Sequence, residues 1–238
     1  MSVYAISDLH GWPLEKLIRL LESVNFTDED TLYVLGDVID RNGDGGVAML
    51  RCIMDRPNFE FILGNHEDML LACDFLFVEI GDESISKLTQ EDLVSLDRYY
   101  RNGGEVTLKS LRALEREEPG SIADVLDFLR DAPLFGAVTV NGRDFLLVHA
   151  GLGHFSPEKK LSDYEKFDLI WERPALETEY FGDVTTVFGH TPTLYYGDEY
   201  AGRVIKTRTW INIDTGAAGG LAPALLRLDD LEVFYGEE

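Results

Sequence analysis

The sequence predicts an α/β fold whose mixed sheet divides into two packed layers. Within residues 1–80, short apolar runs alternate with helical patterns, which is typical of a largely parallel core. In the second half, Asn141-Gly142 stands between the apolar runs 138–140 and 145–148, a strong signal for an antiparallel hairpin. The chain of 238 residues can bury one substantial core, so we expect a single domain with room for an insertion.

Each predicted strand is a short apolar run bounded by glycine or polar residues, as buried strands usually are. In chain order the runs are 3–6, 31–35, 59–63, 138–140, 145–148, 185–188, 225–228 and 231–235. Helical patterns separate the first three runs, so we expect those strands to lie parallel. Asp229-Asp230 joins the last two runs and predicts a terminal hairpin.

Helical spacing fills the segments between the early strands and dominates the middle of the chain. The segments with this spacing are 14–21, 47–54, 68–78, 106–116 and 122–130. Thr89 with Asp92, and Ser121 with Asp124, have the spacing of capping boxes at helix starts. Because strand signals vanish there, we expect a helical insertion over 79–131.

Composition limits the partners and the compartment of the chain. The net charge of −23 argues against a long nucleic acid, because phosphate binding needs a basic face. This charge indicates either a solvated acidic surface or attraction of basic phosphoproteins. No apolar run approaches a membrane span, and the segment Met1–Ile6 predicts a strand, not a signal peptide. Cys52 and Cys73 lie in apolar, helical-looking stretches, which predicts reduced core thiols and a cytoplasmic location.

Five polar clusters follow directly after apolar runs. They are Ser7–Gly11, Gly36–Arg41, Gly64–Glu67, Val148–Gly151 and Gly189–Thr191. Any one cluster could be a cap or a turn, but five in order predict side chains that converge on a metal site. Oxygen and nitrogen ligands without cysteine suit Mn, Fe or Zn.

The candidate ligands divide between two ions. Asp8 and His10 are two residues apart, so in extended backbone both side chains can reach one face. Asp37 has two carboxylate oxygens and could bridge two ions roughly 3.5–4 Å apart. Asn65 offers a neutral oxygen, and His149 and His190 in the last two clusters offer imidazole nitrogens.

Together these motifs resemble the signature of the phosphoprotein phosphatase family of metallophosphoesterases, with most similarity to the bacterial and phage lambda-type members. The resemblance implies one calcineurin-like domain over 1–238, a β-sandwich flanked by helices. It implies two divalent metal ions, Mn first and Fe or Zn as alternatives. The implied ligands are Asp8, His10 and Asp37 for the first ion, and Asp37, Asn65, His149 and His190 for the second.

His66 stands beside Asn65 and is the candidate general acid, because expelling an alkoxide from phosphorus benefits from a proton donor. The resemblance supplies Asp40 as its carboxylate partner. It also assigns phosphate binding to Asn65, Arg41 and, more loosely, Arg173, since guanidinium matches phosphate geometry. An exposed salt-bridging role is the alternative for Arg173.

The sequence departs from many eukaryotic members at Leu63, where they carry an arginine before the Gly-Asn-His-Glu motif. One phosphate contact is therefore expected to be missing or supplied from elsewhere. His154 matches no ligand position and is expected in a loop, and Asp214 is expected to shape a turn near the site. Trp12 and Tyr99-Tyr100 could line a substrate groove, but packing is the preferred interpretation.

The expected activity is metal-dependent hydrolysis of a phosphomonoester, with in-line attack on phosphorus by a water that two metal ions activate. Protein phosphoserine and phosphothreonine, and also phosphotyrosine, are the expected substrates, with other small phosphoesters open. The alternative is a symmetrical diadenosine tetraphosphate hydrolase. Such relatives tend to lack an aspartate at the position of Asp40 and to have aspartate in place of Glu67, so these two residues favour the monoesterase. A third hypothesis, an inactive scaffold, conflicts with the full set of ligand positions.

Overall fold

The computed structural model describes residues 1–77 and 88–237. The longer helices are α1 (Leu14–Ser23), α2 (Val47–Met54), α3 (Asn65–Leu71), α5 (Gln90–Arg101), α6 (Glu105–Glu117), α7 (Ser121–Asp131) and α8 (Lys166–Ile170). The strands are β1 (Val3–Ile6), β2 (Thr31–Val34), β3 (Phe59–Phe61), β4 (Phe135–Val140), β5 (Arg143–Val148), β6 (Val184–Phe188), β7 (Ile205–Lys206), β8 (Trp210–Asn212), β9 (Ala224–Arg227) and β10 (Val233–Tyr235). The 3-10 turns are η1 (Asp74–Phe77), η2 (Leu161–Asp163), η3 (Thr193–Tyr196), η4 (Asp198–Tyr200) and η5 (Ala217–Gly219).

The strands form two five-stranded sheets, so the predicted mixed sandwich is confirmed. Sheet A has the order β10-β9-β1-β2-β3, in which β1, β2 and β3 lie parallel as predicted. Sheet B has the order β4-β5-β6-β8-β7, and it contains the Asn141-Gly142 hairpin between β4 and β5. The second half is less antiparallel than expected, since β5, β6 and β8 lie parallel. The connections between these strands carry α8, short 3-10 turns and the two-residue strand β7, so no long helical periodicity signals the parallel pairing.

Alternation along each strand divides the interior into three layers of packing. Ala5 of β1 and Phe145 and Leu147 of β5 face the space between the sheets. Tyr4 and Ile6 face the helices that cover sheet A. This period-two pattern is what a strand buried on both faces requires. The outer face of sheet B packs against α8 and the loops around it.

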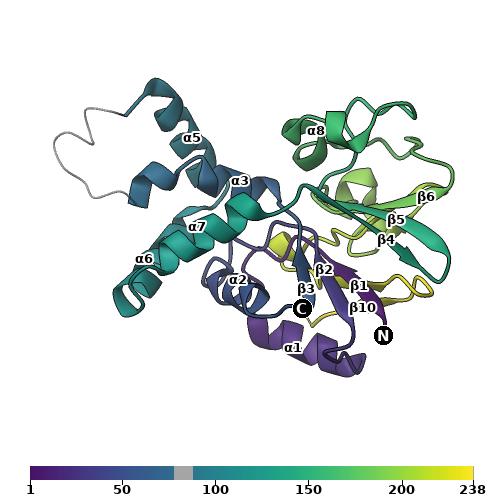
Figure 1. The fold of residues 1–238 in the computed structure, drawn as a ribbon, viewed down its shortest axis with the longest axis horizontal. Helices are drawn as coiled ribbons and strands as arrows, with labels where there is room; N and C mark the ends of the chain where they lie inside the picture. Colours follow the sequence, from purple (N-terminus) through teal and green to yellow (C-terminus); the bar gives the residue numbers. More distant parts are fainter. Residues whose placement is uncertain (78–87, 238) are drawn as a thin grey trace.

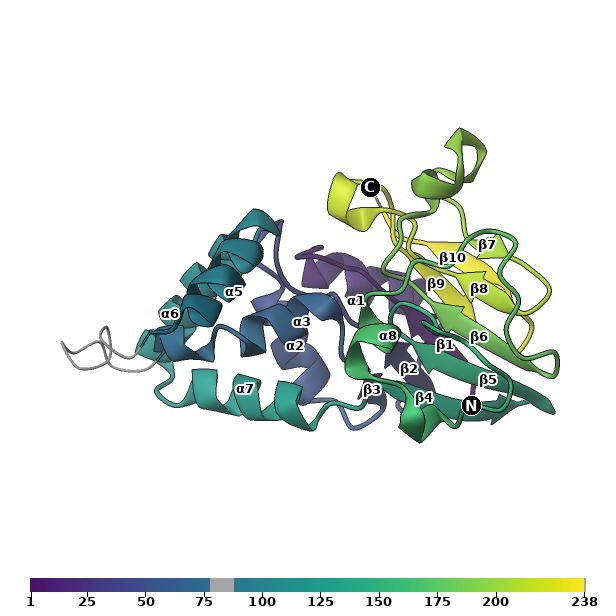
Figure 2. The same ribbon diagram turned by 90° about the horizontal axis from the view of Figure 1, so that it is seen from above.

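Helices α1, α2, α3, α5, α6 and α7 gather on the outer side of sheet A, and α5–α7 extend farthest from the sheets (Figures 1 and 2). Leu108 and Leu111 of α6 and Val125 and Leu129 of α7 join the core that also covers β1–β3. The helical character expected over most of 79–131 is thus present. The expected start of the insertion lies outside the described residues.

Two helix starts differ in how they are capped. Thr89 and Asp92 form the predicted capping box at α5. The box predicted for Ser121 with Asp124 is wrong. Glu115 of the preceding helix caps α7 instead, because its carboxylate accepts hydrogen bonds from the backbone N–H groups of Gly120 and Ile122 at 2.8 and 2.9 Å. The helix expected over 68–78 begins earlier, at Asn65, and ends at Leu71; position 78 is not described.

Two further properties concern the whole described chain. No helix in residues 1–77 and 88–237 combines the length and the apolar character needed to cross a bilayer. Cys73 is buried and Cys52 is partly buried, and both are free thiols. Burial raises the pKa of the Cys73 thiol to about 11, so this side chain is a packing element.

Candidate functional site

The polar clusters that follow the strands come together at one edge of the sandwich. Asp8, Asp37 and Asn65 lie just past the carboxyl ends of β1, β2 and β3, and His149 and His190 lie just past β5 and β6. Parallel strands end at a common edge, which is where open α/β sheets bind ligands. The cavity there is lined by His10, Asp37, Arg41, Asn65, His66, Asn102, Trp171, Arg173, His190, Pro192, Tyr195, Asp214 and Ala218.

The backbone at this edge is held in a conformation that side chains rarely adopt. The φ angle is 54° at Asp8, 43° at His10, 53° at Asp37 and 62° at His190. Left-handed backbone at non-glycine residues persists only where the surroundings enforce it, and it concentrates at functional sites. Four of the six predicted metal ligands therefore lie on strained backbone.

Glycines beside the ligands allow close approach of the loops that follow the strands. A Cβ atom on Gly189 would lie 2.0 Å from Oδ2 of Asp8, and one on Gly64 would lie 2.4 Å from Oδ1 of Asp37. Both distances are far below van der Waals contact. The glycines in the Gly-Asn-His-Glu and Gly-His-Thr motifs are therefore required by packing against the carboxylates.

Within residues 1–77 and 88–237, two groups of side chains could each hold a metal ion, and they share Asp37. One group is His10, Asp37 and His66, and the other is Asp37, His149 and His190. Oδ2 of Asp37 lies 3.6 Å from Nε2 of His10, and Oδ1 lies 3.4 Å from Nε2 of His149. The two oxygens of one carboxylate thus face the two groups. This is the arrangement a bridging ligand needs.

The imidazole rings are oriented so that their Nε2 atoms could bind a metal ion. Nδ1 of His10 lies 3.0 Å from the carbonyl oxygen of Ile39, and Nδ1 of His149 lies 2.6 Å from that of Leu35. An Nδ1–H donated to a carbonyl leaves the Nε2 lone pair free, which is how metal-binding histidines are usually oriented. Nε2 of His190 is buried without a hydrogen-bond partner. A divalent cation would satisfy that atom.

Asp8 and Asn65 reach the same cluster with their oxygens engaged in other contacts. The Asp8 carboxylate accepts from the backbone N–H of His190 at 2.9 and 3.1 Å. Oδ1 of Asn65 lies 3.0 Å from Nε2 of His149. Burial and then the neighbouring Asp214 raise the pKa of Asp8 well above its usual value. Burial, followed by Asp8 and Glu67, does the same to the pKa of Asp37. Several carboxylates that are buried close together can all be ionised only if a cation neutralises their charge.

His66 and Asp40 form a buried pair with Nδ1 and Oδ2 2.6 Å apart, as expected. The other oxygen of Asp40 accepts from the hydroxyls of Tyr99 at 2.9 Å and Thr107 at 2.6 Å. Burial raises the pKa of Asp40 to about 7. Burial and then Arg41 lower the pKa of His66 to about 3. Both shifts have the same cause, since a buried site opposes charge on either partner.

The two arginines lie on either side of the cluster. Nη2 of Arg41 is 3.1 Å from Nε2 of His66, so that nitrogen accepts a hydrogen bond and the ring is neutral here. This contact makes His66 a weaker candidate for metal binding than its place in the first group suggests. Nη1 of Arg173 is 3.3 Å from Oγ1 of Thr191 and 3.4 Å from the carbonyl oxygen of His190. Arg173 therefore lies at the site and not in a surface ion pair.

Three residues whose structural roles the sequence did not reveal hold this arrangement together. The Glu67 carboxylate accepts from the backbone N–H groups of Asp37 at 2.9 Å and of the two residues that follow, at 2.9 and 3.3 Å. Its position next to His66 in the motif was a signal for such a role. Tyr99 and Thr107, by contrast, are 59 and 67 residues from Asp40, and no local pattern connects them.

The sequence match to a family model identifies the family of the chain. The model of the calcineurin-like phosphoesterase family matches residues 1–215. The chain belongs to this family. As a phosphoesterase of this family it is expected to bind metal, which agrees with the two groups around Asp37.

Two curated relatives of this phosphoesterase have the same name. A protein of Acidovorax ebreus, the symmetrical bis(5'-nucleosyl)-tetraphosphatase, is 28% identical over 198 residues, which are 82% of this chain and 59% of that protein. The chain thus spans 59% of the length of that relative. A protein of the same name from Salmonella paratyphi B is 43% identical over 74 residues, 30% of this chain and 26% of its own length.

Two solved structures share the fold of this phosphoesterase. A candidate diadenosine tetraphosphatase aligns with a TM-score of 0.63 and 18% identity, over 98% of this chain and 91% of that one. A serine/threonine phosphatase from Saccharomyces cerevisiae aligns with a TM-score of 0.59 and 15% identity, over 100% of this chain and 80% of that one. At these identities the likeness concerns the fold.

Three further residues that the sequence singled out, Leu63, His154 and Asp214, lie outside the two metal groups. Leu63 is buried in the core between sheet A and the helices, so no charged group replaces the arginine at that position. His154 is an exposed loop residue paired with Asp168. Asp214 shapes its turn by accepting from the N–H of Gly216, and it also lines the cavity.

Of the three aromatic residues considered as groove residues, only one is exposed. Trp12 packs in the core between sheet A and the helices and donates to the carbonyl of Glu237. Tyr99 is fully buried against Asp40, whereas Tyr100 is exposed. The preferred interpretation, packing, therefore holds for Trp12 and Tyr99.

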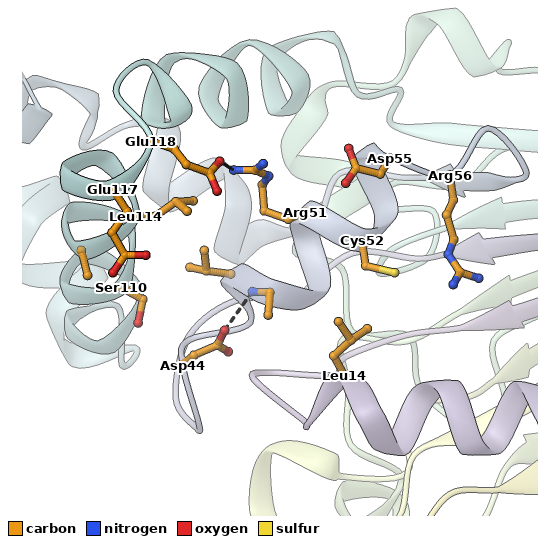
Figure 3. Close-up of a pocket in the computed structure, with 13 residues that line it drawn as sticks. Leu14, Asp44, Arg51, Cys52, Asp55, Arg56, Ser110, Leu114, Glu117 and Glu118 are labelled. Atoms are coloured by element: carbon orange, nitrogen blue, oxygen red, sulfur yellow. Dashed lines mark hydrogen bonds and ion pairs between the residues drawn. The ribbon is translucent and has the colours of Figure 1, made fainter.

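A wider hollow lies elsewhere on the phosphoesterase, between α2 and α6 (Figure 3). Arg51 reaches Glu118 across it in an ion pair of 2.9 Å, and Asp44 caps the start of α2. None of the metal-group residues lines this hollow. Most of the candidate metal ligands instead line the smaller, more polar cavity at the strand ends.

Proposed function

We propose that the chain is a metal-dependent hydrolase of dinucleoside polyphosphates that splits bis(5'-nucleosyl) tetraphosphates symmetrically. The observation that carries the proposal is the name shared by its curated relatives, one of which aligns over 82% of the chain. As that alignment covers 59% of the relative, the activity of the longer protein is carried over as a hypothesis. The site is compatible, because two arginines flank a carboxylate and histidine cluster.

We assign Asp8, His10 and Asp37 to the first divalent ion, and Asp37, Asn65, His149 and His190 to the second. When bound, such ions neutralise phosphoryl oxygens and lower the pKa of a coordinated water. Mn is the first choice, with Fe or Zn as alternatives, because the donors are oxygens and imidazole nitrogens. We also propose that residues 1–238 form a single domain, with a helical insertion over residues 79–131.

The chain's own residues supply binding and proton transfer. Arg41 and Arg173 are assigned to the phosphoryl oxygens, where guanidinium pairs most closely. When Arg41 turns to the substrate, it leaves Nε2 of His66 and ceases to lower the pKa of that ring. His66, paired with Asp40, can then hold a proton at Nε2 and pass it to the departing oxygen. One P–O–P bridge is broken by one water, which leaves two nucleoside diphosphates.

A second candidate, a phosphomonoesterase acting on protein phosphoserine, phosphothreonine or phosphotyrosine, rests on one specific contact. The His66–Asp40 pair at 2.6 Å is an acid dyad, and a dyad matters most when the leaving group is a basic alkoxide. A nucleoside diphosphate is a weaker base and depends on the dyad less. The resemblance to the phage lambda-type phosphatases points the same way.

The two candidates are separated by one assay. Metal-stripped protein is supplied with Mn and given diadenosine tetraphosphate and a phosphopeptide panel side by side, and products are resolved by chromatography. The proposal expects metal-dependent appearance of ADP as the sole nucleotide product, faster than phosphate release from peptides. Phosphate release from peptides alone would reverse the order of the two candidates.

A further inference from the structure

A second hollow lies beside the cavity at the strand ends, next to Arg173. This hollow is lined by Arg173, Pro174, Ala175, Thr191, Tyr195 and Tyr196. Arg173 and Tyr195 line both spaces, so the two hollows adjoin at these side chains. A ligand that is held at the metal groups by one end can therefore extend along Arg173 towards Tyr195.

Tyr195 is the most exposed member of a firmly held turn. The N–H of Thr193 donates to the carbonyl of Asp214 at 2.9 Å, which ties the turn to the strand end of sheet B. Tyr196 donates its hydroxyl to the carbonyl of Pro174 at 2.9 Å and lies against the ring of Trp210. Tyr195 itself is 76% exposed. A rigid backbone thus presents one large aromatic ring to solvent beside the reaction centre.

The charges around the second hollow favour an anionic ligand. The chain has a net charge of −23, yet none of the described residues that line this hollow carries a carboxylate. Its charged group is the guanidinium of Arg173, and its walls are Pro174, Ala175 and two tyrosines. A basic peptide would find no complementary charge there. A phosphate chain that ends in a flat, uncharged ring would find a cation followed by an aromatic surface.

We propose that the ring of Tyr195 stacks on a nucleobase of the substrate, with Arg173 contacting the phosphate chain between that base and the metal groups. The inference rests on the proposed function, since it names the subsite for the nucleoside half that departs. Every nucleobase has a face that can stack on an aromatic side chain, so the subsite accepts a nucleoside of any base.

Binding of the product tests this directly. The probes are ADP and inorganic pyrophosphate, which present the same diphosphate with and without a nucleoside, titrated calorimetrically into Mn-loaded protein. Wild type should bind ADP more tightly than pyrophosphate. Y195A should weaken ADP binding by about tenfold, as loss of one stacked base predicts, and leave pyrophosphate binding unchanged. Y195F should retain ADP binding, because phenylalanine keeps the aromatic face.

Leu194→Ala is the matched control, since Leu194 is a half-exposed neighbour in the same turn and lines neither space. It should bind both probes as wild type does, and equal melting temperatures establish that each variant is folded. Equal ADP affinity in wild type and Y195A would overturn the subsite, as would equal binding of the two probes by wild type. Loss of phosphopeptide turnover in Y195A with ADP affinity intact would assign the ring to a peptide instead.

The results of these experiments distinguish failure of the Tyr195 subsite from failure of the proposed function. Dependence of ADP binding on Tyr195 in a protein that does not cleave diadenosine tetraphosphate would keep the subsite and remove the proposed function. Cleavage of that dinucleotide by a protein whose ADP affinity is the same in Y195A would do the reverse.

Discussion

Nδ1 of His66 lies 2.6 Å from Oδ2 of Asp40, and both side chains are buried. The contact fixes the ring so that Nε2 is directed towards Arg41 and the carboxylate of Asp37. Proton transfer through such a pair matters more when the leaving oxygen is more basic. Substrates with different leaving groups can therefore test the role of this contact.

Replacing His66 by alanine should affect substrates unequally. General acids contribute about 100-fold or more when the leaving group is an alkoxide, and much less when it is a p-nitrophenolate. H66A is expected to lose about 100-fold in kcat/KM on alkyl phosphates but less than about tenfold on p-nitrophenyl phosphate. H154A, in an exposed loop, is the control. Equal losses on both substrates would remove His66 as the general acid.

Tyr99 should act as a positioning residue through Asp40. Its hydroxyl donates at 2.9 Å and helps to lower the pKa of a carboxyl that burial raises to about 7. Removing the donor therefore raises this pKa further, and the acid limb of the pH–rate profile should move to higher pH in Y99F. A loss of about tenfold on alkyl phosphates is expected from one hydrogen bond to a charged group. Y100F, at the exposed neighbour, should show the wild-type profile. An unmoved acid limb in Y99F would separate Tyr99 from the dyad.

Asp37 should be required for the binding of both metal ions. Each of its oxygens faces a different group of histidines, so removing the side chain takes a ligand from both. Metal analysis after gel filtration should find about two ions per wild-type chain and D37A almost free of metal. D28A, an exposed aspartate, should keep both ions. A D37A protein that retains two ions would contradict a bridging role.

Mn binding should strengthen as pH rises above the usual titration range of carboxylic acids. Burial raises the pKa values of Asp8 and Asp37, so these acids stay protonated to higher pH than usual, and a proton competes with the ion. The histidines do not oppose this trend, because burial lowers their pKa values, to about 3 for His149. Calorimetric titration in buffers of different ionisation enthalpy should find tighter binding at pH 8 than at pH 5.5, with proton release. Affinity that is the same at both pH values would argue that these carboxylates are not ligands.

Glu67 should stabilise the loop that carries Asp37. Its two oxygens accept three backbone N–H groups, and an amide in place of the carboxylate would bring a donor against a donor. E67Q should lower the free energy of unfolding by about 1–3 kcal/mol, measured by denaturant titration. E60Q is the control because Glu60 is exposed on β3. Unchanged stability in E67Q would mean that water replaces these bonds.

The parts of the site that follow strand ends were predictable, and the parts that arrive from elsewhere were not. Asp8, Asp37 and Asn65 could be located because an apolar run, a turn and a polar residue are adjacent in the sequence. The Asn141-Gly142 hairpin was predictable for the same local reason, and both residues have φ near the value its turn requires, 50° and 77°. The donors to Asp40 come from helices whose position depends on packing, which periodicity does not encode.

The hydroxyls of Tyr99 and Thr107 make the helices α5 and α6 part of the acid pair and not merely a cover over the sheet. Trimming the chain to its sandwich, or exchanging this segment for that of a relative, would therefore alter proton transfer at the same time as the shape of the entrance. Engineering of substrate range in this scaffold has to carry both donors along, or the grafted segment will change rate and selectivity in a single step.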